Sequence, residues 1–121
     1  MSWGYRQSTG QLTDPAGKHI TFGYSGHAAG VNNPAMQAVP FVGPIPAGEY
    51  RIGPAYRHPK LGRCVMNLEP VGHDAEGRLY FRLHGDNSRM NRTGSEGCIV
   101  APFHARAAMD ASPNRTLIVV P

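Results

Sequence analysis

The sequence predicts a mainly β domain, a β-sandwich or partly closed barrel of six or seven short strands with one short helix packed at one end. Glycine (15) and proline (11) are frequent among the 121 residues, which is typical of short strands joined by turns. Only one segment has a convincing helical composition, whereas apolar residues alternate or run together in several others. The length suits a single domain, 1–121, with one functional site.

The first third of the sequence predicts a β-hairpin. An alternating segment at 3–12 precedes the turn at 14–17, and a second strand follows at 19–24. Pro15 presets the backbone of the turn, and Gly17 permits the chain to reverse. These features place two antiparallel strands at the start of the domain.

A long loop is expected at 25–46, where no period of 2 or 3.6 persists. Loops of this length in compact domains usually carry function, so we expect it to line a substrate site. A turn rich in proline and glycine then leads into a strand in which Tyr50 and Ile52 share one face.

The remaining elements follow in order. The β-branched run at the end of the chain predicts a strand buried on both faces. The sequence predicts strands at 64–68, 79–83 and 116–120, a hairpin loop at 73–78 and a helix at 102–111.

Charge and hydropathy exclude several classes of protein. Charged residues make up 17% of the chain and hydrophobic residues 40%, which disfavours intrinsic disorder. The net charge of +4 comes from scattered arginines, so we expect no nucleic-acid partner. We expect no membrane insertion and no secretory signal, and thus a soluble chain made in the cytoplasm, because the sequence has no long apolar run.

The two cysteines leave three possibilities open: one disulfide, a free core thiol, or a nucleophile. Cys64 lies in an apolar strand and is expected to be a buried thiol. Cys98 follows a glycine close to a histidine. No CxxC or HExxH pattern occurs, so we expect no metal and no other cofactor.

The densest group of reactive residue types lies between His84 and Cys98. A cysteine attacks as the thiolate and needs a base nearby, for which histidine is suited because its pKa lies near neutrality. Gly97 leaves backbone exposed, so the N–H groups of Gly97 and Cys98 can hold an oxyanion. The alternative is a structural thiol beside a strand-end histidine, which is the commoner situation for an isolated pair.

Sequence motifs around this pair resemble those of the YkuD-like L,D-transpeptidases, cysteine enzymes that remodel peptidoglycan. Glu96 stands where the commonest form of this YkuD-like signature has histidine. Five blocks in order are most similar to the type VI secretion L,D-transpeptidase effector family. They are QSTGQL at 7–12, GYSG at 23–26, NNP at 32–34, HGDN at 84–87 and SEGCI at 95–99.

This resemblance implies an L,D-transpeptidase-like β fold, with the short helix after the catalytic cysteine. It also implies that the Cys98 thiolate attacks the L-centre carbonyl of diaminopimelate in a tetrapeptide stem and expels D-alanine, with His84 moving the proton. Water then completes an L,D-carboxypeptidase reaction, whereas a D-amino acid completes an exchange.

Residues around the pair are expected to play supporting roles, each with a structural alternative. Ser95 would hydrogen-bond within the cysteine loop, and Asp86 and Asn87 would orient His84, although such residues also form turns. Glu96 would bind the amino group of diaminopimelate or of an incoming D-amino acid, or remain solvated. Three residues would line the donor groove or serve packing: Tyr24, Asn33 and Gln37.

The resemblance further implies an antibacterial toxin that a secretion apparatus delivers to the periplasm of a target cell, and an immunity protein that protects the producer. Two other classes stay open. One is a peptidoglycan-binding module without turnover, and the other is a cysteine protease or amidase that cleaves ordinary L,L-peptides.

Overall fold

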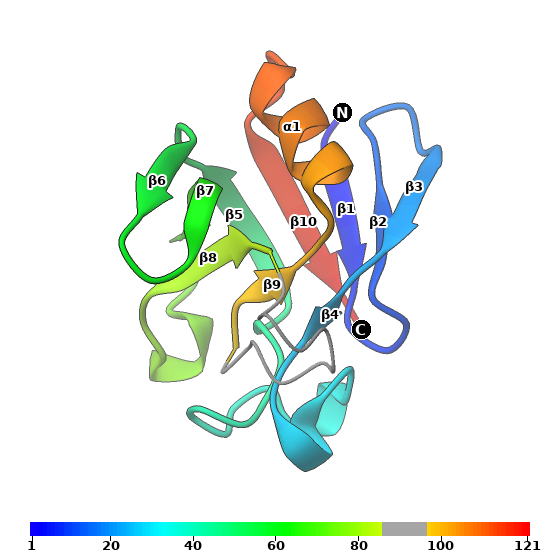
Figure 1. Ribbon diagram of the computed structural model, residues 1–121. Helices are drawn as coiled ribbons and strands as arrows, with labels where there is room; N and C mark the ends of the chain where they lie inside the picture. The colour runs from blue at the N-terminus through cyan, green and yellow to red at the C-terminus, as the bar shows by residue number, and fades with distance from the viewer. Residues whose placement is uncertain (86–96) are drawn as a thin grey trace.

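The computed structural model describes residues 1–85 and 97–121 and confirms a mainly β domain (Figure 1). This part of the chain contains ten strands, one α-helix and three 3₁₀ turns. The strands are β1 (Trp3–Arg6), β2 (Gln11–Thr13), β3 (His19–Phe22), β4 (Tyr24–Ser25), β5 (Gly48–Ile52), β6 (Tyr56–His58), β7 (Gly62–Val71), β8 (Phe81–His84), β9 (Ile99–Val100) and β10 (Thr116–Val120). The helix is α1 (Phe103–Ala111), and the 3₁₀ turns are η1 (Ala28–Gly30), η2 (Pro34–Met36) and η3 (Ala75–Gly77).

The strands form one sheet in the order β3-β2-β1-β10-β5-β7-β8-β9-β4, and β6 pairs with β7 beside this path. The two ends of the order, β3 and β4, are separated in the chain by Gly23 alone, so the sheet curls into a nearly closed barrel. A Cβ atom at Gly23 would lie 2.2 Å from the carbonyl oxygen of Val100 in β9. Glycine is therefore required where the two ends of the sheet approach each other.

The core fills the inside of this curled sheet. Tyr50 and Ile52 point into it together, as predicted. Arg51, which lies between them, and Glu49, which precedes Tyr50, are exposed. The prediction that the last strand is buried on both faces was wrong. Leu117 and Val119 are buried, but Ile118 is only half-buried, because an outer strand face of this small barrel has no second layer to cover it.

The N-terminal hairpin is confirmed as β2 and β3, and Asp14 stabilises its turn by accepting hydrogen bonds from the N–H groups of Ala16 and Lys18. The single strand expected at 3–12 is instead two. Gly10, with φ of 77°, donates its N–H to the carbonyl of Arg6 and reverses the chain between β1 and β2. This reversal releases β1 to pair in parallel with β10.

Two short strands were not predicted. β6 pairs with the first part of β7, and β9 occupies the segment that was expected only to lead into the helix. The strand expected at 79–83 begins instead at Phe81, because Tyr80 has φ of 66°, outside the extended range. Helix α1 is confirmed, with Pro102 as its N-terminal flanking residue.

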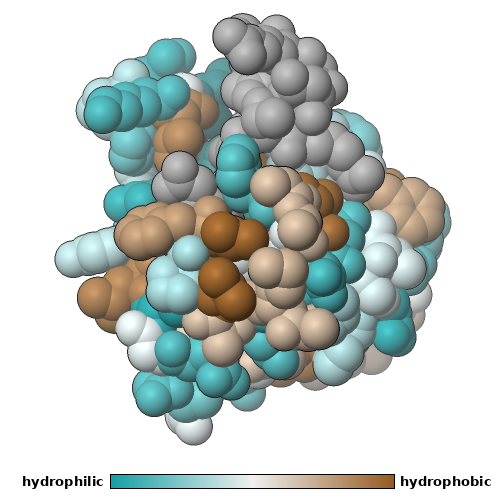
Figure 2. All heavy atoms as spheres, turned by 90° about the horizontal axis from the view of Figure 1, so that it is seen from below, coloured by the Kyte–Doolittle hydropathy of each residue, from teal (hydrophilic) through white to brown (hydrophobic). Residues whose placement is uncertain are grey.

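The long loop at 26–46 contains only η1 and η2, as expected for a segment without periodicity. It forms the lower end of the molecule in Figure 1, opposite α1 at the top. Seen from below, apolar side chains gather at the centre of this end of the molecule (Figure 2). Val39 and Phe41 of the loop are among the large apolar side chains that remain exposed.

Candidate active site

The candidate site lies at the ends of β8 and β9, which run in parallel. Leu83 pairs with Ile99 and His84 with Val100. Leu83 and Ile99 both belong to the core. His84 ends β8 and Cys98 comes directly before β9, so the parallel pairing brings the two segments that carry these residues side by side.

The backbone next to His84 orients its imidazole. The ring is 2% exposed, and Nδ1 lies 2.7 Å from the carbonyl oxygen of Gly85. Because a carbonyl only accepts, Nδ1 carries the hydrogen and donates it, which makes Nε2 the basic nitrogen of the neutral ring. A Cβ at Gly85 would lie 2.8 Å from the guanidinium of Arg106, itself bonded to the carbonyl of Ala101 ahead of α1.

Gly97 shapes the approach to the thiol. Its φ of 126° is a conformation that residues with a side chain rarely adopt. Its carbonyl accepts a hydrogen bond of 3.2 Å from the buried hydroxyl of Ser25, whose oxygen in turn accepts one of 2.8 Å from the N–H of Ile45. Ser25 thereby joins the cysteine segment to the loop that precedes β5.

Arg78 places a buried positive charge beside Gly97 and Cys98. Its guanidinium donates to the carbonyls of Gln37, Gly43 and Pro44. Burial lowers the pKa of Arg78, while attraction to Tyr50 and to Cys98 acts in the opposite direction. That electrostatic contact means that the guanidinium and a thiolate at position 98 stabilise each other.

The Cys98 sulfur is half-buried and belongs to no disulfide, and the same is true of Cys64. Cys98 Sγ lies 3.9 Å from the carbonyl oxygen of Tyr80. Cys64 packs against the core, so the expectation of a structural thiol there is met only in part, since it is not fully buried.

Tyr24 lies in the same region as the pair. Tyr24 in β4 pairs with Val100 in β9, and His84 in β8 pairs with Val100 from the opposite neighbouring strand. Tyr24 and His84 therefore flank Val100 on one face of the sheet. The Tyr24 side chain is buried.

Asn33 and Gln37 are held by the long loop itself. The Asn33 side chain caps η2 by accepting from the N–H of Ala35 and donates to the carbonyl of Ala29. Gln37 Oε1 accepts hydrogen bonds from the N–H of Ala47 and the side chain of Gln7. Both side chains thus shape the loop, and their place in the donor groove stays a prediction.

Four predicted site residues, Asp86, Asn87, Ser95 and Glu96, lie outside the described residues. Among 1–85 and 97–121, no three or more histidine, cysteine, aspartate or glutamate side chains gather as a metal site would require. None of the helices in these ranges is long and apolar enough to cross a membrane.

A family model for the Tlde1 domain matches residues 19–120, which is most of the chain. The chain belongs to the Tlde1 domain family. This family comprises type VI secretion effectors that act on peptidoglycan, which agrees with the similarity seen in the sequence motifs. A search of curated proteins found no match.

Sequence reasoning missed three elements of the Tlde1 site. Ser25 carried a signal, since it lies in one of the motifs that resemble the effector family, but its bonds to Gly97 and Ile45 depend on tertiary contacts. Arg78 was one of several scattered arginines and had no distinguishing pattern. The Gly85 carbonyl could not be recognised, because a backbone acceptor leaves no residue-type signal.

Proposed function

We propose that this Tlde1 domain is a cysteine L,D-carboxypeptidase and L,D-transpeptidase that acts on tetrapeptide stems of peptidoglycan. The parallel pairing of β8 and β9 carries the proposal, because the base candidate His84 ends β8 and the nucleophile candidate Cys98 comes directly before the neighbouring β9. The hydrogen bond from Nδ1 to Gly85 supports it by leaving the basic nitrogen at Nε2.

In the first step, His84 accepts the thiol proton and the Cys98 sulfur attacks the carbonyl of the L-centre of diaminopimelate. The C–S bond forms, the C–N bond to D-alanine breaks, and the leaving amine takes the proton from His84. The backbone N–H groups of Gly97 and Cys98 would stabilise the oxyanion, an effect typically worth about 3 kcal/mol for each donor.

In the second step, a nucleophile attacks the thioester and restores the thiol. Water yields a stem shortened by one residue, and a D-amino acid yields a stem with an exchanged terminus. In both cases His84 removes a proton from the nucleophile and returns it to the sulfur. Both reactions consume the donor stems that wall growth needs, which fits delivery into the periplasm of a target cell and an immunity partner in the producer.

The test is incubation of purified protein with tetrapeptide muropeptides, with and without a free D-amino acid, followed by mass spectrometry. We expect loss of one alanine from the stem and, with the D-amino acid present, its incorporation. Cys98→Ala and His84→Ala should abolish both products, whereas the matched variant Cys64→Ala should retain them. Unchanged stem masses with the intact protein would instead indicate a binding module.

A second comparison separates the proposal from an ordinary cysteine protease. Matched stems that differ only in the chirality of the terminal residue should give turnover with the D-residue alone. Equal cleavage of both stems would contradict the assignment.

A further inference from the structure

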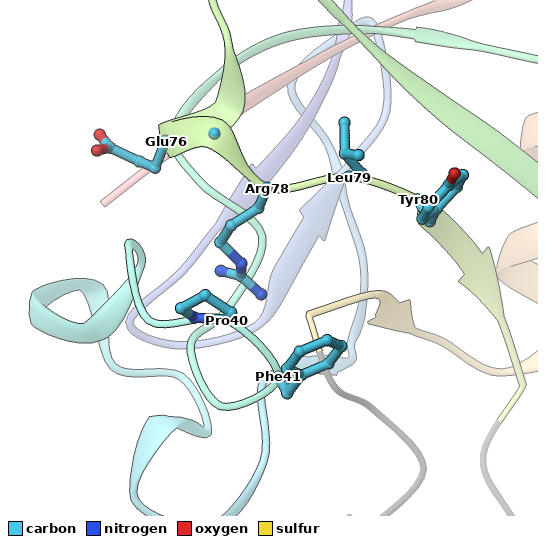
Figure 3. Close-up of a pocket in the computed structure, with 7 residues that line it drawn as sticks. Pro40, Phe41, Glu76, Arg78, Leu79 and Tyr80 are labelled. Carbon is cyan, nitrogen blue, oxygen red and sulfur yellow. The ribbon is translucent and has the colours of Figure 1, made fainter.

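A pocket of about 300 Å³ opens at the segment 76–80, which also contacts the cysteine segment. The loop residues Pro40 and Phe41 form one side, and the segment 76–80 ahead of β8 forms the other (Figure 3). Tyr80 joins the pocket to the site, because its side chain lines the pocket while its carbonyl oxygen lies 3.9 Å from Cys98 Sγ. One residue of the pocket wall therefore also contacts the Cys98 sulfur.

The walls of the pocket are large apolar side chains that face water. Phe41 is 70% exposed, Leu79 72% and Tyr80 78%. Single exposed apolar residues are ordinary, but three of them around one depression favour a binding role.

The backbone at two of these residues is held in an unfavourable conformation. Phe41 has φ of 64° and Tyr80 has φ of 66°, a region that bulky side chains seldom occupy. Such conformations persist only where the surroundings enforce them, and they concentrate at functional sites. Here the enforcing contacts come from Arg78, which bonds to Gln37 on one side of the Phe41 turn and to Gly43 and Pro44 on the other.

The charge around the pocket favours an anionic group next to the apolar walls. Of the two charged residues that line the pocket, Arg78 points its guanidinium toward Pro40 and Phe41 in Figure 3, whereas the Glu76 carboxylate extends to the left, away from these two residues. The positive potential of Arg78 attracts a carboxylate without requiring a direct bond to it.

We propose that this pocket binds the D-amino acid that enters the exchange reaction and selects one with a large apolar side chain. The inference rests on the proposed function of Cys98. An amino acid with an aromatic or branched side chain would place its carboxylate in the field of Arg78, its side chain against Phe41, Leu79 and Tyr80, and its amine toward the thioester. The methyl group of D-alanine would leave most of the pocket empty.

The chemistry balances without a further reagent. The amine of the incoming D-amino acid attacks the thioester carbonyl, the C–N bond forms and the C–S bond breaks. His84 takes one proton from the amine and passes it to the sulfur. Selection then depends on how well the side chain is held while the amine attacks.

The test is an exchange competition in one tube. The protein receives tetrapeptide stems and an equimolar mixture of isotopically labelled D-alanine, D-aspartate and D-phenylalanine, and mass spectrometry gives the ratio of products. We expect D-phenylalanine to be incorporated about ten-fold or more over D-alanine, since burial of an aromatic ring is worth at least that factor. D-Aspartate should be the poorest of the three, because its second carboxylate would meet the apolar walls.

Leu79→Asn and Phe41→Asn should reduce the preference to about three-fold or less, by the loss of apolar contact. The ratio comes from one sample and does not depend on how much of the variant folds. The matched control is Phe22→Asn, because Phe22 is an exposed apolar residue on β3 that does not line the pocket. This variant should leave the ratio unchanged. A ratio near one, or a preference unaffected by the pocket variants, would overturn the proposal while leaving Cys98-dependent turnover intact.

A binding measurement separates this proposal from the catalytic one. Cys98→Ala protein titrated with D-phenylalanine in a calorimeter should show saturable binding that Leu79→Asn weakens several-fold and Phe22→Asn does not. If stems are not turned over at all, the proposed function fails, and the titration still decides whether the pocket takes an apolar amino acid. Absence of binding would then overturn the pocket proposal as well.

Discussion

The Cα atom of Gly97 packs against Arg78 so closely that a Cβ atom at position 97 would lie 2.2 Å from Nη2 of the guanidinium. The glycine before the cysteine and the buried arginine ahead of β8 therefore depend on each other. Arg78 also fastens the long loop through the carbonyls of Gln37, Gly43 and Pro44. One guanidinium thus connects the loop, the segment 76–80 and the cysteine segment.

Gly97→Ala is expected to destabilise the protein by about 3 kcal/mol or more, because two effects act together. Alanine is strained at this positive φ, and its methyl group would clash with the Arg78 guanidinium, which backbone carbonyls hold in place. Gly62→Ala is the control, since Gly62 also has positive φ, 85°, but a Cβ there would meet nothing within 4 Å. It should cost only about 1 kcal/mol. Urea unfolding measures both, and equal losses would show that Arg78 yields to the added methyl group.

Arg78→Met should slow alkylation of Cys98 at neutral pH. Removal of the cation removes the attraction that favours the thiolate, so the midpoint of the alkylation profile should move to higher pH. Arg78→Lys keeps the charge and should shift the profile less, although both variants lose the forked hydrogen bonds. Measurements in a Cys64→Ala background report Cys98 alone, and identical profiles for both variants would contradict an electrostatic role.

Ser25→Ala should reduce turnover and stability together. The change leaves the buried N–H of Ile45 without its acceptor and removes the donor to the Gly97 carbonyl, at a cost of about 2 kcal/mol. Ser112→Ala removes a hydroxyl that accepts from Trp3 and the N–H of Asn114 at the C-terminal end of α1. It should lower stability while leaving turnover per folded molecule intact. A similar loss of turnover in both variants would argue that Ser25 does not position the cysteine segment.

Tyr50→Phe should make the stability of the protein less sensitive to alkaline pH. Burial raises the pKa of Tyr50 well above its ordinary value of 10.0, with Arg78 opposing the shift. The unfolded chain therefore loses this proton first as pH rises, so the native state of the wild type loses stability above about pH 10. Phenylalanine has no ionisable group, so Tyr50→Phe should not lose stability in this way.

At pH 7 Tyr50→Phe should instead be less stable by about 1 kcal/mol, because it lacks the 2.8 Å hydrogen bond to the Pro46 carbonyl. Urea unfolding at pH 7 and between pH 9 and 11 measures both effects. Parallel stability curves for variant and wild type across this range would show that Tyr50 does not contribute to the alkaline loss.

Local patterns predicted most of the elements. Alternation identified β5 and β7, the turn at 14–17 located the first hairpin, and composition located α1. Local patterns failed where one backbone conformation decides the outcome. Gly10 and Tyr80 have positive φ, and each interrupts an expected strand. A residue in this conformation ends the extended backbone whatever the neighbouring side chains favour.

The sequence by itself determined the mainly β class, the family resemblance and the identity of the nucleophile and base candidates, because periodicity, turn residues and motifs are properties of neighbouring residues. Only the tertiary structure decided that β8, which ends at His84, runs parallel to β9, which follows Cys98, that the Gly85 carbonyl orients the ring, and that Arg78 joins the cysteine segment to the pocket. The strand pairing depends on backbone hydrogen bonds, and the side chains of His84 and Arg78 bond to backbone carbonyls. Any residue type supplies these backbone groups, so no local pattern records the arrangement.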